Sequence, residues 1–542
     1  MAPRHLVRSP NRSAAAAARS ENGYYPAPRP RIVVPMETIA GLDPEALNRA
    51  RISRDPRFDG KFYIAVTSTG IYCRPICPSR YAKRANVRFF GSPAAAEAAG
   101  FRPCLRCRPE AAPGTPAWLG TAAVVRRALR LINEGSLDED SVEALAGRLG
   151  IGPRHLLRLF SRHVGASPIA VAQTRRLHFA VCLLEQTDLP ITQIAMAAGF
   201  GSSRRFNDAF RHTYQRAPRE LRRVGRRGGG GSEEVVLRLA YRPPYDWSHM
   251  RDFLARRAVA GVERVDGGGY ARTVACEGGP AFIRVSAVPD EHALELRVAG
   301  APPAALLQLS SAARRVFDLA ADPQRIGLEL ATDALIGPLV RQRPGLRIPG
   351  AWEPFECAVR AVLGQQVSVA AGCTFAARLV AQAGTVIGGR SDGLTHLFPT
   401  APALAAANLA ALGITRSRAA TLHALARAVI ERRIDFSAAP EEVAAAMAAL
   451  PGIGPWTAQY VALRALAEPD ALPTGDLVLR RMAAPGGRLL SVRELEVRAR
   501  DWQPWRGYAV IHLWHAAGEQ APPRDGERRR PRPSVPHSIL AS

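Results

Sequence analysis

Lysine is almost missing from this 542-residue chain: Lys61 and Lys83 are the only two, so nearly all of its positive charge is arginine. Long apolar runs are also missing, since no stretch of about 18 uninterrupted apolar residues occurs. The N-terminus scatters arginine through alanine and has no charged head, apolar run and cleavage site in succession. These absences predict a cytoplasmic protein without a membrane span or a secretory leader.

Cysteine is scarce and unevenly placed. Four of the eight cysteines lie in GIYCRPICPSR (70–80) and FRPCLRC (101–107). Lasting disulfides are rare in a reducing compartment, so clustered thiols there usually bind metal or react. Two short-spaced pairs from separate loops can surround a tetrahedral ion. The pattern predicts zinc, with unliganded thiols as the alternative, and the ligands would be Cys73, Cys77, Cys104 and Cys107.

The net charge is +26, which favours a polyanionic partner because arginines that neutralise phosphates release condensed counterions. A basic but merely solvated surface is the alternative. The sequence RRVGRRGGGGSEE (222–234) is typical of a flexible linker and predicts two separate halves. The ends, 1–38 and 520–542, are rich in arginine and proline without apolar periodicity, which predicts disorder, and Met36 could be the true start.

Between these segments the predicted fold is multidomain and mainly α, with α+β parts. A compact cysteine domain is expected at 39–115, helices at 116–224, and the linker at 225–234. Short alternating runs such as AFIRVSAV predict an antiparallel sheet with helices at 235–349. An all-α region is expected at 350–519, where the pattern is helical and alanine-rich with Gly and Pro breaks.

One pattern occurs twice in the helical part of the first half. VEALAGRLGIGPRHLLRLFSRHVGASP (142–168) and ITQIAMAAGFGSSRRFNDAFRHTYQRAP (191–218) each hold an apolar helix, a glycine turn and a second helix. This layout predicts a duplicated helix-turn-helix whose second helices lie in the major groove of DNA. Four arginines on those helices can contact phosphate or read guanine: Arg154, Arg158, Arg204 and Arg205.

The second half contains ALPGIGPWTAQY (449–460), in which Gly452 and Gly454 permit a tight hairpin before a helix. Exposed amides at that helix start can bind a DNA phosphate. About 20 residues later, Asp476 lies in a short loop before LVLRR. An aspartate there can cap the helix, and it can also act in catalysis.

The cysteine region resembles the N-terminal domain of Ada proteins, through the segments RDPRFDGKFYIAVTSTGIYCRPICPSR and GFRPCLRC. The resemblance implies that Cys73 accepts a methyl group from a methylphosphotriester, once per molecule, while all four cysteines hold zinc. The repeated helix pattern is similar to AraC-type regulators, and Ada proteins carry the same module in this position. The second methyltransferase motif of Ada, Pro-Cys-His-Arg, is missing, so repair at guanine O6 is not expected.

Most of 235–518 resembles AlkA, a helix-hairpin-helix glycosylase for alkylated purines. The segments that carry this resemblance are RPPYDWSHMRDFLARRAV, RPGLRIPGAWEPFECAVRAVLGQQVSV, LPGIGPWTAQYVALRAL and WQPWRGYAVIHLWH. It implies catalysis by Asp476 and a base pocket formed by Phe253, Trp456, Tyr460 and Trp514, any of which could instead be core. Gln366 stands where AlkA has its Leu wedge, and Leu477 where AlkA has Tyr, which leaves the wedge and the substrate range open.

A glycosylase that also cuts the strand uses a lysine, and none follows Lys83, so this enzyme is expected to be monofunctional and to need no cofactor. The sequence therefore predicts an alkylbase glycosylase joined to a methylation-sensing regulator, monomeric and associated with the bacterial nucleoid. Alkylated and promoter double-stranded DNA are the expected partners, and RNA polymerase is a further candidate. The alternative is a regulator whose glycosylase half only grips DNA.

Overall fold

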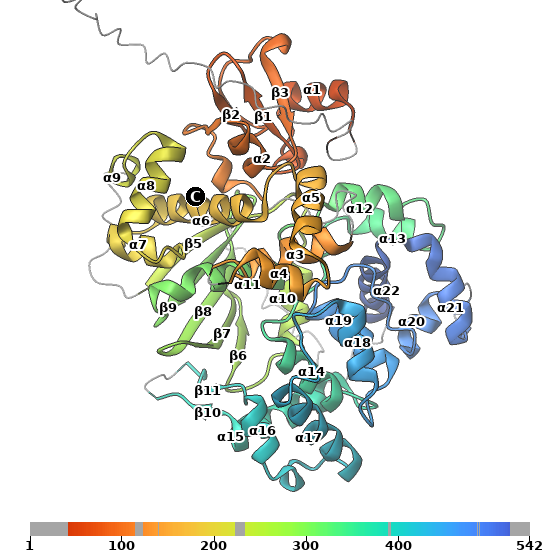
Figure 1. Cartoon of the computed structure of the whole chain (residues 1–542). Helices are drawn as coiled ribbons and strands as arrows, with labels where there is room; N and C mark the ends of the chain where they lie inside the picture. Colours follow the sequence, from red (N-terminus) through yellow and green to blue (C-terminus); the bar gives the residue numbers. More distant parts are fainter. Residues whose placement is uncertain are drawn as a thin grey trace, which may run out of the picture.

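The structure is a computed structural model, and it describes residues 39, 42–113, 123–138, 140–222, 234–388, 392–484, 486 and 488–520. The predicted disordered N-terminus, the possible start at Met36 and nearly all of the predicted linker and disordered tail lie outside these residues; Gln520, the first residue of that tail, ends a helix. Within the described ranges, no helix combines the length and apolar character needed to cross a membrane. Figure 1 shows the cysteine domain at the top and the C-terminal helices at the lower right.

The cysteine domain is a four-stranded sheet in the order β3-β1-β2-β4, and all its pairings are antiparallel except β2 with β4. The parallel register sets Tyr72 opposite Pro103, which brings the cysteine pair after β4 next to the pair that begins at the end of β2. The elements are α1 (Pro44–Ser53), β1 (Tyr63–Val66), β2 (Ile71–Cys73), β3 (Val87–Phe90), α2 (Pro93–Ala98) and β4 (Arg102–Pro103).

The predicted duplicated helix-turn-helix is present as α4–α5 and α7–α8, with the long helix α6 between them (Figure 1). Serine side chains cap α4 and α8: Ser141 Oγ accepts from the Ala144 amide and Ser202 Oγ from the Arg205 amide. The helices are α3 (Ala123–Asn133), α4 (Val142–Arg148), α5 (Pro153–His163), α6 (Pro168–Gln186), α7 (Ile191–Ala197), α8 (Ser203–Tyr214) and α9 (Pro218–Leu221).

The predicted antiparallel sheet has five strands in the order β5-β9-β8-β7-β6. Alternate residues of β8 and β9 are buried, as expected for a sheet covered on one face. The elements are β5 (Glu234–Ala240), α10 (Trp247–Ala255), β6 (Glu263–Asp266), β7 (Gly269–Cys276), β8 (Gly279–Ala287), β9 (Ala293–Ala299), α11 (Leu306–Val316), α12 (Pro323–Leu330) and α13 (Ile336–Gln342).

The C-terminal region is helical as predicted, and it also contains a short ribbon of two strands, β10 and β11. The hairpin at 449–454 joins α18 to α19. The elements are α14 (Pro354–Leu363), α15 (Val369–Ala383), β10 (Thr385–Val386), β11 (His396–Leu397), α16 (Ala401–Ala406), α17 (Arg416–Ile430), α18 (Pro440–Ala448), α19 (Pro455–Arg464), α20 (Leu477–Met482), α21 (Val492–Arg498) and α22 (Arg506–Gln520).

The linker composition predicts two independent halves, and the structure contradicts this. One apolar core contains buried residues of α6 to α8, such as Leu183 and Phe206, together with sheet residues such as Leu237 and Leu296. The Arg238 amide of β5 also donates to Gln186 Oε1 of α6 at 2.7 Å. Because burying apolar surface on both sides favours contact, a flexible connection does not keep the halves apart.

Candidate active site and metal centre

Asp476 is the N-cap residue of α20, and its two carboxylate oxygens have different partners. Oδ1 accepts from the Leu479 amide at 2.8 Å, while Oδ2 accepts from Trp456 Nε1 at 3.1 Å. The side chain is half-buried. The residue predicted to be catalytic is thus a helix cap in the structure: the cap fixes the carboxylate, while the Trp456 indole holds its second oxygen.

Three aromatic side chains form a wall next to this carboxylate. Trp456 and Tyr460 lie one turn apart on α19, and their rings stack with centroids 5.4 Å apart and an interplanar angle of 22°. Trp514 of α22 lies 6.2 Å from Tyr460. All three are partly exposed, although Trp456 and Tyr460 each cover one ring face of the other. An electron-rich wall of this kind attracts a flat cation.

Phe253, the fourth predicted pocket residue, is placed differently. It is only 4% exposed, and two guanidinium carbons lie over its ring, those of Arg257 at 3.8 Å and Arg464 at 4.7 Å. Arg464 also donates to the Tyr460 hydroxyl at 2.6 Å. Burial lowers the pKa of Arg257 to about 10. Phe253 and the two arginines therefore support the wall from behind.

The sequence reasoning did not identify these two arginines. Arg257 follows Phe253 by four residues and Arg464 follows Tyr460 by four, the spacing at which helix neighbours meet. That spacing is a signal that could have found them.

The hairpin before α19 has the tight backbone that its glycines predict. Gly452 has a φ of +85°, and a side-chain carbon there would lie 2.0 Å from Thr421 Oγ1, so no larger residue fits without a rearrangement. Gly454 is the N-cap residue of α19 and is exposed. Gln365 Nε2 donates to the Gly452 carbonyl at 2.9 Å, which ties the hairpin to the loop after α14.

Gln366, the residue at the predicted wedge position, lies in that same loop. It is exposed and has a φ of +53°, a conformation that non-glycine residues seldom adopt. The four predicted DNA-contacting arginines are exposed as well: Arg154 and Arg158 on α5, and Arg204 and Arg205 on α8. The opposite faces of these helices carry the buried residues Leu156, Phe160, Phe206 and Phe210.

The four clustered cysteines converge on one point. The sulfur atoms of Cys73, Cys77, Cys104 and Cys107 all lie within 4.8 Å of one another. A tetrahedral zinc with Zn–S bonds of about 2.3 Å needs sulfurs about 3.8 Å apart, so the donor set fits zinc. Four thiolates this close together repel one another, so they need a cation at their centre to stay deprotonated together.

Arg74, which the sequence reasoning also missed, supports this centre. Its backbone N–H lies 3.3 Å from Cys107 Sγ, and its guanidinium donates to the Cys107 carbonyl at 3.1 Å and to Asp59. Arg74 lies between Cys73 and Cys77 in the sequence, and this position alone does not indicate that it binds Asp59 and Cys107.

Four protein families match the chain in succession. They are described as the metal binding domain of Ada (46–110), a helix-turn-helix domain (145–224), the AlkA N-terminal domain (236–353) and the HhH-GPD superfamily of base excision DNA repair proteins (359–506). Zinc is thus supported by both the family match and the sulfur geometry. The helix-turn-helix and HhH-GPD matches support DNA binding.

Three curated relatives cover different parts of the chain. The "DNA-3-methyladenine glycosylase 2" of Escherichia coli is 41% identical over 52% of this chain and 98% of its own length. The "Bifunctional transcriptional activator/DNA repair enzyme Ada" of the same organism is 35% identical over 35% of this chain and 50% of its own length.

The third relative spans nearly the whole chain. It is the "Probable bifunctional transcriptional activator/DNA repair enzyme AlkA" of Mycobacterium tuberculosis, 41% identical over 87% of this chain and 96% of its own length. This one match therefore covers both halves of the chain. This chain belongs to the family of bifunctional transcriptional activator and DNA repair enzymes of the AlkA type.

Proposed function

We propose that the C-terminal half is a monofunctional DNA glycosylase that hydrolyses the bond between an alkylated base, such as 3-methyladenine, and its deoxyribose. The observation that carries this proposal is the Asp476 carboxylate, held by the Trp456 indole at 3.1 Å beside the aromatic wall. A base that has left the helix stack can lie against the wall, and a positively charged alkylpurine gains most from it.

In this proposal Asp476 acts on the sugar. As the bond to the base breaks, positive charge develops on the deoxyribose, and a carboxylate nearby stabilises that charge or orients the attacking water. Water supplies the hydroxyl group at the sugar carbon, and the base leaves with the bonding electron pair. A strand-cutting reaction would need a lysine nucleophile, which the sequence after Lys83 does not contain. No cofactor is assigned to this half.

The N-terminal half is proposed to record phosphate methylation. Zinc keeps thiols deprotonated at neutral pH. The Cys73 sulfur attacks the methyl carbon of a methylphosphotriester, an S–C bond forms, the C–O bond breaks, and the phosphodiester leaves with the electron pair. With Zn²⁺ bound, four thiolates would give the site a net charge of 2−, and methylation of one sulfur would reduce it to 1−. At about 10 Å in water each phosphate interaction changes by only about 0.4 kcal/mol, so several phosphates must contribute.

The duplicated helix-turn-helix is proposed to place this sensor on promoter DNA. Its exposed arginines on α5 and α8 suit contact with phosphates or guanines in the major groove. RNA polymerase is the further proposed partner, and the protein is proposed to act as a monomer.

Base release from methylated DNA tests the glycosylase. The wild type should release 3-methyladenine, and Asp476→Asn, which keeps a capping side chain, should lose at least 100-fold in the single-turnover rate. Asp43→Asn is the matched control, because Asp43 caps α1 by the same type of contact outside the site. Equal rates for wild type and Asp476→Asn would exclude this role. Activity in neither would favour the alternative, a regulator with an inactive glycosylase half.

Mass spectrometry tests the sensor separately. After exposure to DNA that carries methylphosphotriesters, the peptide 70–110 should gain one methyl group, on Cys73. Cys73→Ser should gain none. A methyl group on Cys77 instead would overturn the assignment of the acceptor.

A further inference from the structure

The cysteine domain contacts the half of the chain after the linker (residues 234–520, called the repair half) through a buried ion pair. This ion pair is the first part of what we call the docking contact. Lys61 Nζ lies 2.6 Å from Asp322 Oδ2, and the two side chains are 7% and 3% exposed. Burial lowers the pKa of Lys61. Buried charges are costly unless they are paired, and this ion pair joins the two halves. Asp322 Oδ1 also accepts from the Arg325 amide within its own half, at 3.2 Å.

Arg242, in the loop after β5, makes the second part of the docking contact. It is completely buried, and its guanidinium donates to the Asp59 carbonyl at 2.9 Å and the Ala320 carbonyl at 2.7 Å. The Pro113 carbonyl lies 3.4 Å away. Two of these acceptors belong to the cysteine domain, so separating the halves would break both contacts and expose a guanidinium that is buried in the folded chain.

Gly60 allows the two surfaces to come this close. Its φ is +71°, and a side-chain carbon there would lie 2.1 Å from the Pro113 carbonyl oxygen and 2.9 Å from Arg242 Nη2. The docking contact therefore requires a glycine at position 60, because a larger residue there would displace Arg242 or the Pro113 backbone.

Asp59 connects the docking contact to the centre formed by the four clustered cysteines. Its backbone carbonyl accepts from Arg242 of the repair half, while its buried carboxylate binds the Arg74 guanidinium, with Nε at 2.8 Å from Oδ1. Arg74 in turn donates from its backbone N–H toward Cys107 Sγ and from its side chain to the Cys107 carbonyl. Two residues, Arg74 and Asp59, thus separate a sulfur of the centre from the repair half.

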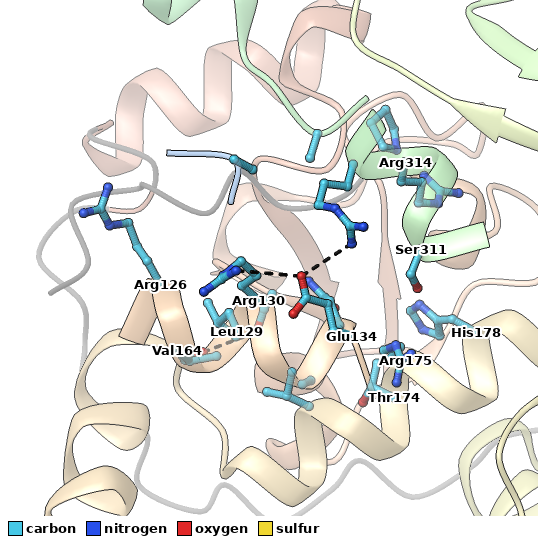
Figure 2. A pocket seen from close by; sticks show the side chains of 18 of the residues that line it. Arg126, Leu129, Arg130, Glu134, Val164, Thr174, Arg175, His178, Ser311 and Arg314 are labelled. Atoms are coloured by element: carbon cyan, nitrogen blue, oxygen red, sulfur yellow. Dashed lines mark hydrogen bonds and ion pairs between the residues drawn. The ribbon is translucent and has the colours of Figure 1, made fainter. Parts of the chain in front are cut away.

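A further contact between the halves lies beside a cavity of about 690 Å³ where all the domains meet. Glu134 of the helix-turn-helix region lies 4.0 Å from Arg130 and 3.4 Å from Arg315 of the repair half (Figure 2). Arg130 itself donates to the Ala438 carbonyl, just before the hairpin helix α18. The docking contact at Arg242 is therefore one part of a larger interface between the two halves.

We propose that the cysteine centre controls how firmly the repair half is docked, through the contacts Cys107–Arg74–Asp59–Arg242. A change at the centre that moves Arg74 releases the Asp59 carboxylate, shifts the adjoining carbonyl and loosens Arg242. This coupling needs neither methyl transfer nor glycosylase activity. Its test is therefore independent of both parts of the proposed function.

Amide hydrogen exchange of the full chain measures the coupling. It is followed in peptides that cover 318–330, the segment with Ala320 and Asp322. In the wild type loaded with zinc, exchange there should be slow, and removal of zinc with a chelator should accelerate it at least tenfold. In Arg74→Met, exchange should already be fast with zinc bound and should change less than threefold on its removal. Arg284→Met is the control, because it removes an ion pair with Asp266 in the domain that contains 318–330. Its exchange should be as slow as in the wild type with zinc and should accelerate equally when zinc is removed.

A second variant covers the case in which Arg74→Met fails to bind zinc. Gly60→Ala leaves all four cysteines and Arg74 in place, and it should give fast exchange in 318–330 with zinc still bound. Gly150→Ala is the matched control, because Gly150 has a similar φ of +69° with no atom near the added carbon. An unchanged 318–330 region in zinc-free wild type, or protection in zinc-bound Gly60→Ala equal to that of the wild type, would overturn the proposal.

Discussion

Single side chains divide into those that a local motif identifies and those that only the fold brings together. Asp476 and the four cysteines stand in short motifs whose chemistry is evident from residue type and spacing, and the structure brings the four sulfurs together and sets Asp476 beside Trp456. The resemblance to AlkA predicts Phe253 in the pocket, with a place in the core as the alternative. In the structure two guanidiniums lie over its ring, that of Arg257 four residues later and that of Arg464 on α19, which only the fold brings near.

The Trp456 indole offers a test at this level. Trp456→Phe keeps an aromatic ring on the wall but loses the hydrogen bond to Asp476. A hydrogen bond to a charged group contributes about 1.5–3 kcal/mol. The single-turnover rate of base release should therefore fall about 10- to 100-fold.

Trp502→Phe is the control for that experiment. The Trp502 indole donates to Asp333 at 2.9 Å, a pair of the same type that is not part of the aromatic wall. This variant should lose stability in thermal unfolding and keep the rate of base release. A Trp456→Phe enzyme as fast as the wild type would show that the indole does not position the carboxylate.

Helices and strands follow closely from local sequence because their signals are local. Glycine turns and apolar spacing predict the two helix-turn-helix units, and alternation predicts an antiparallel sheet, which has five strands in the structure. The ribbon of β10 and β11 was not predicted, because strands of two residues carry too little pattern. Its place is set by tertiary contacts, since Thr395 and His396 donate to the Gly261 carbonyl.

Helix α8 gives a prediction that depends on an element and its exposed face. Arg204 is exposed, while the face that carries Phe206 and Phe210 is buried, so Arg204→Gln should leave the fold intact. If Arg204 contacts a phosphate, the slope of log affinity for promoter DNA against log salt should fall by about 0.9. Titrations at several salt concentrations measure it.

Arg251→Gln serves as the control, because Arg251 lies on α10, outside the helix-turn-helix region, and pairs only with its neighbour Asp252 at the surface. Its salt slope should equal that of the wild type. An unchanged slope in Arg204→Gln combined with altered base preference would instead assign Arg204 to base recognition.

The arrangement of the whole molecule was the least predictable part. A Gly-rich linker predicts independence because its composition describes only the connection itself. Whether the connected surfaces adhere depends on pairs such as Lys61 with Asp322, whose partners lie in different domains. Neither local sequence indicates the other partner, so the interface becomes visible only in three dimensions.

Cutting the linker tests whether that interface holds the halves together. A protease site in place of Gly228–Gly231 allows cleavage of the folded chain, and the two fragments should still elute together in gel filtration. The shared core is apolar and the Lys61–Asp322 pair is buried, so about 0.5 M salt should not separate them, because salt screens mainly exposed charges. Separation at low salt would contradict the common core, whereas separation only as salt rises would show that surface charge holds the halves. Co-elution at both salt concentrations would mean that buried side chains, and not the linker, keep the two halves of the chain in one body.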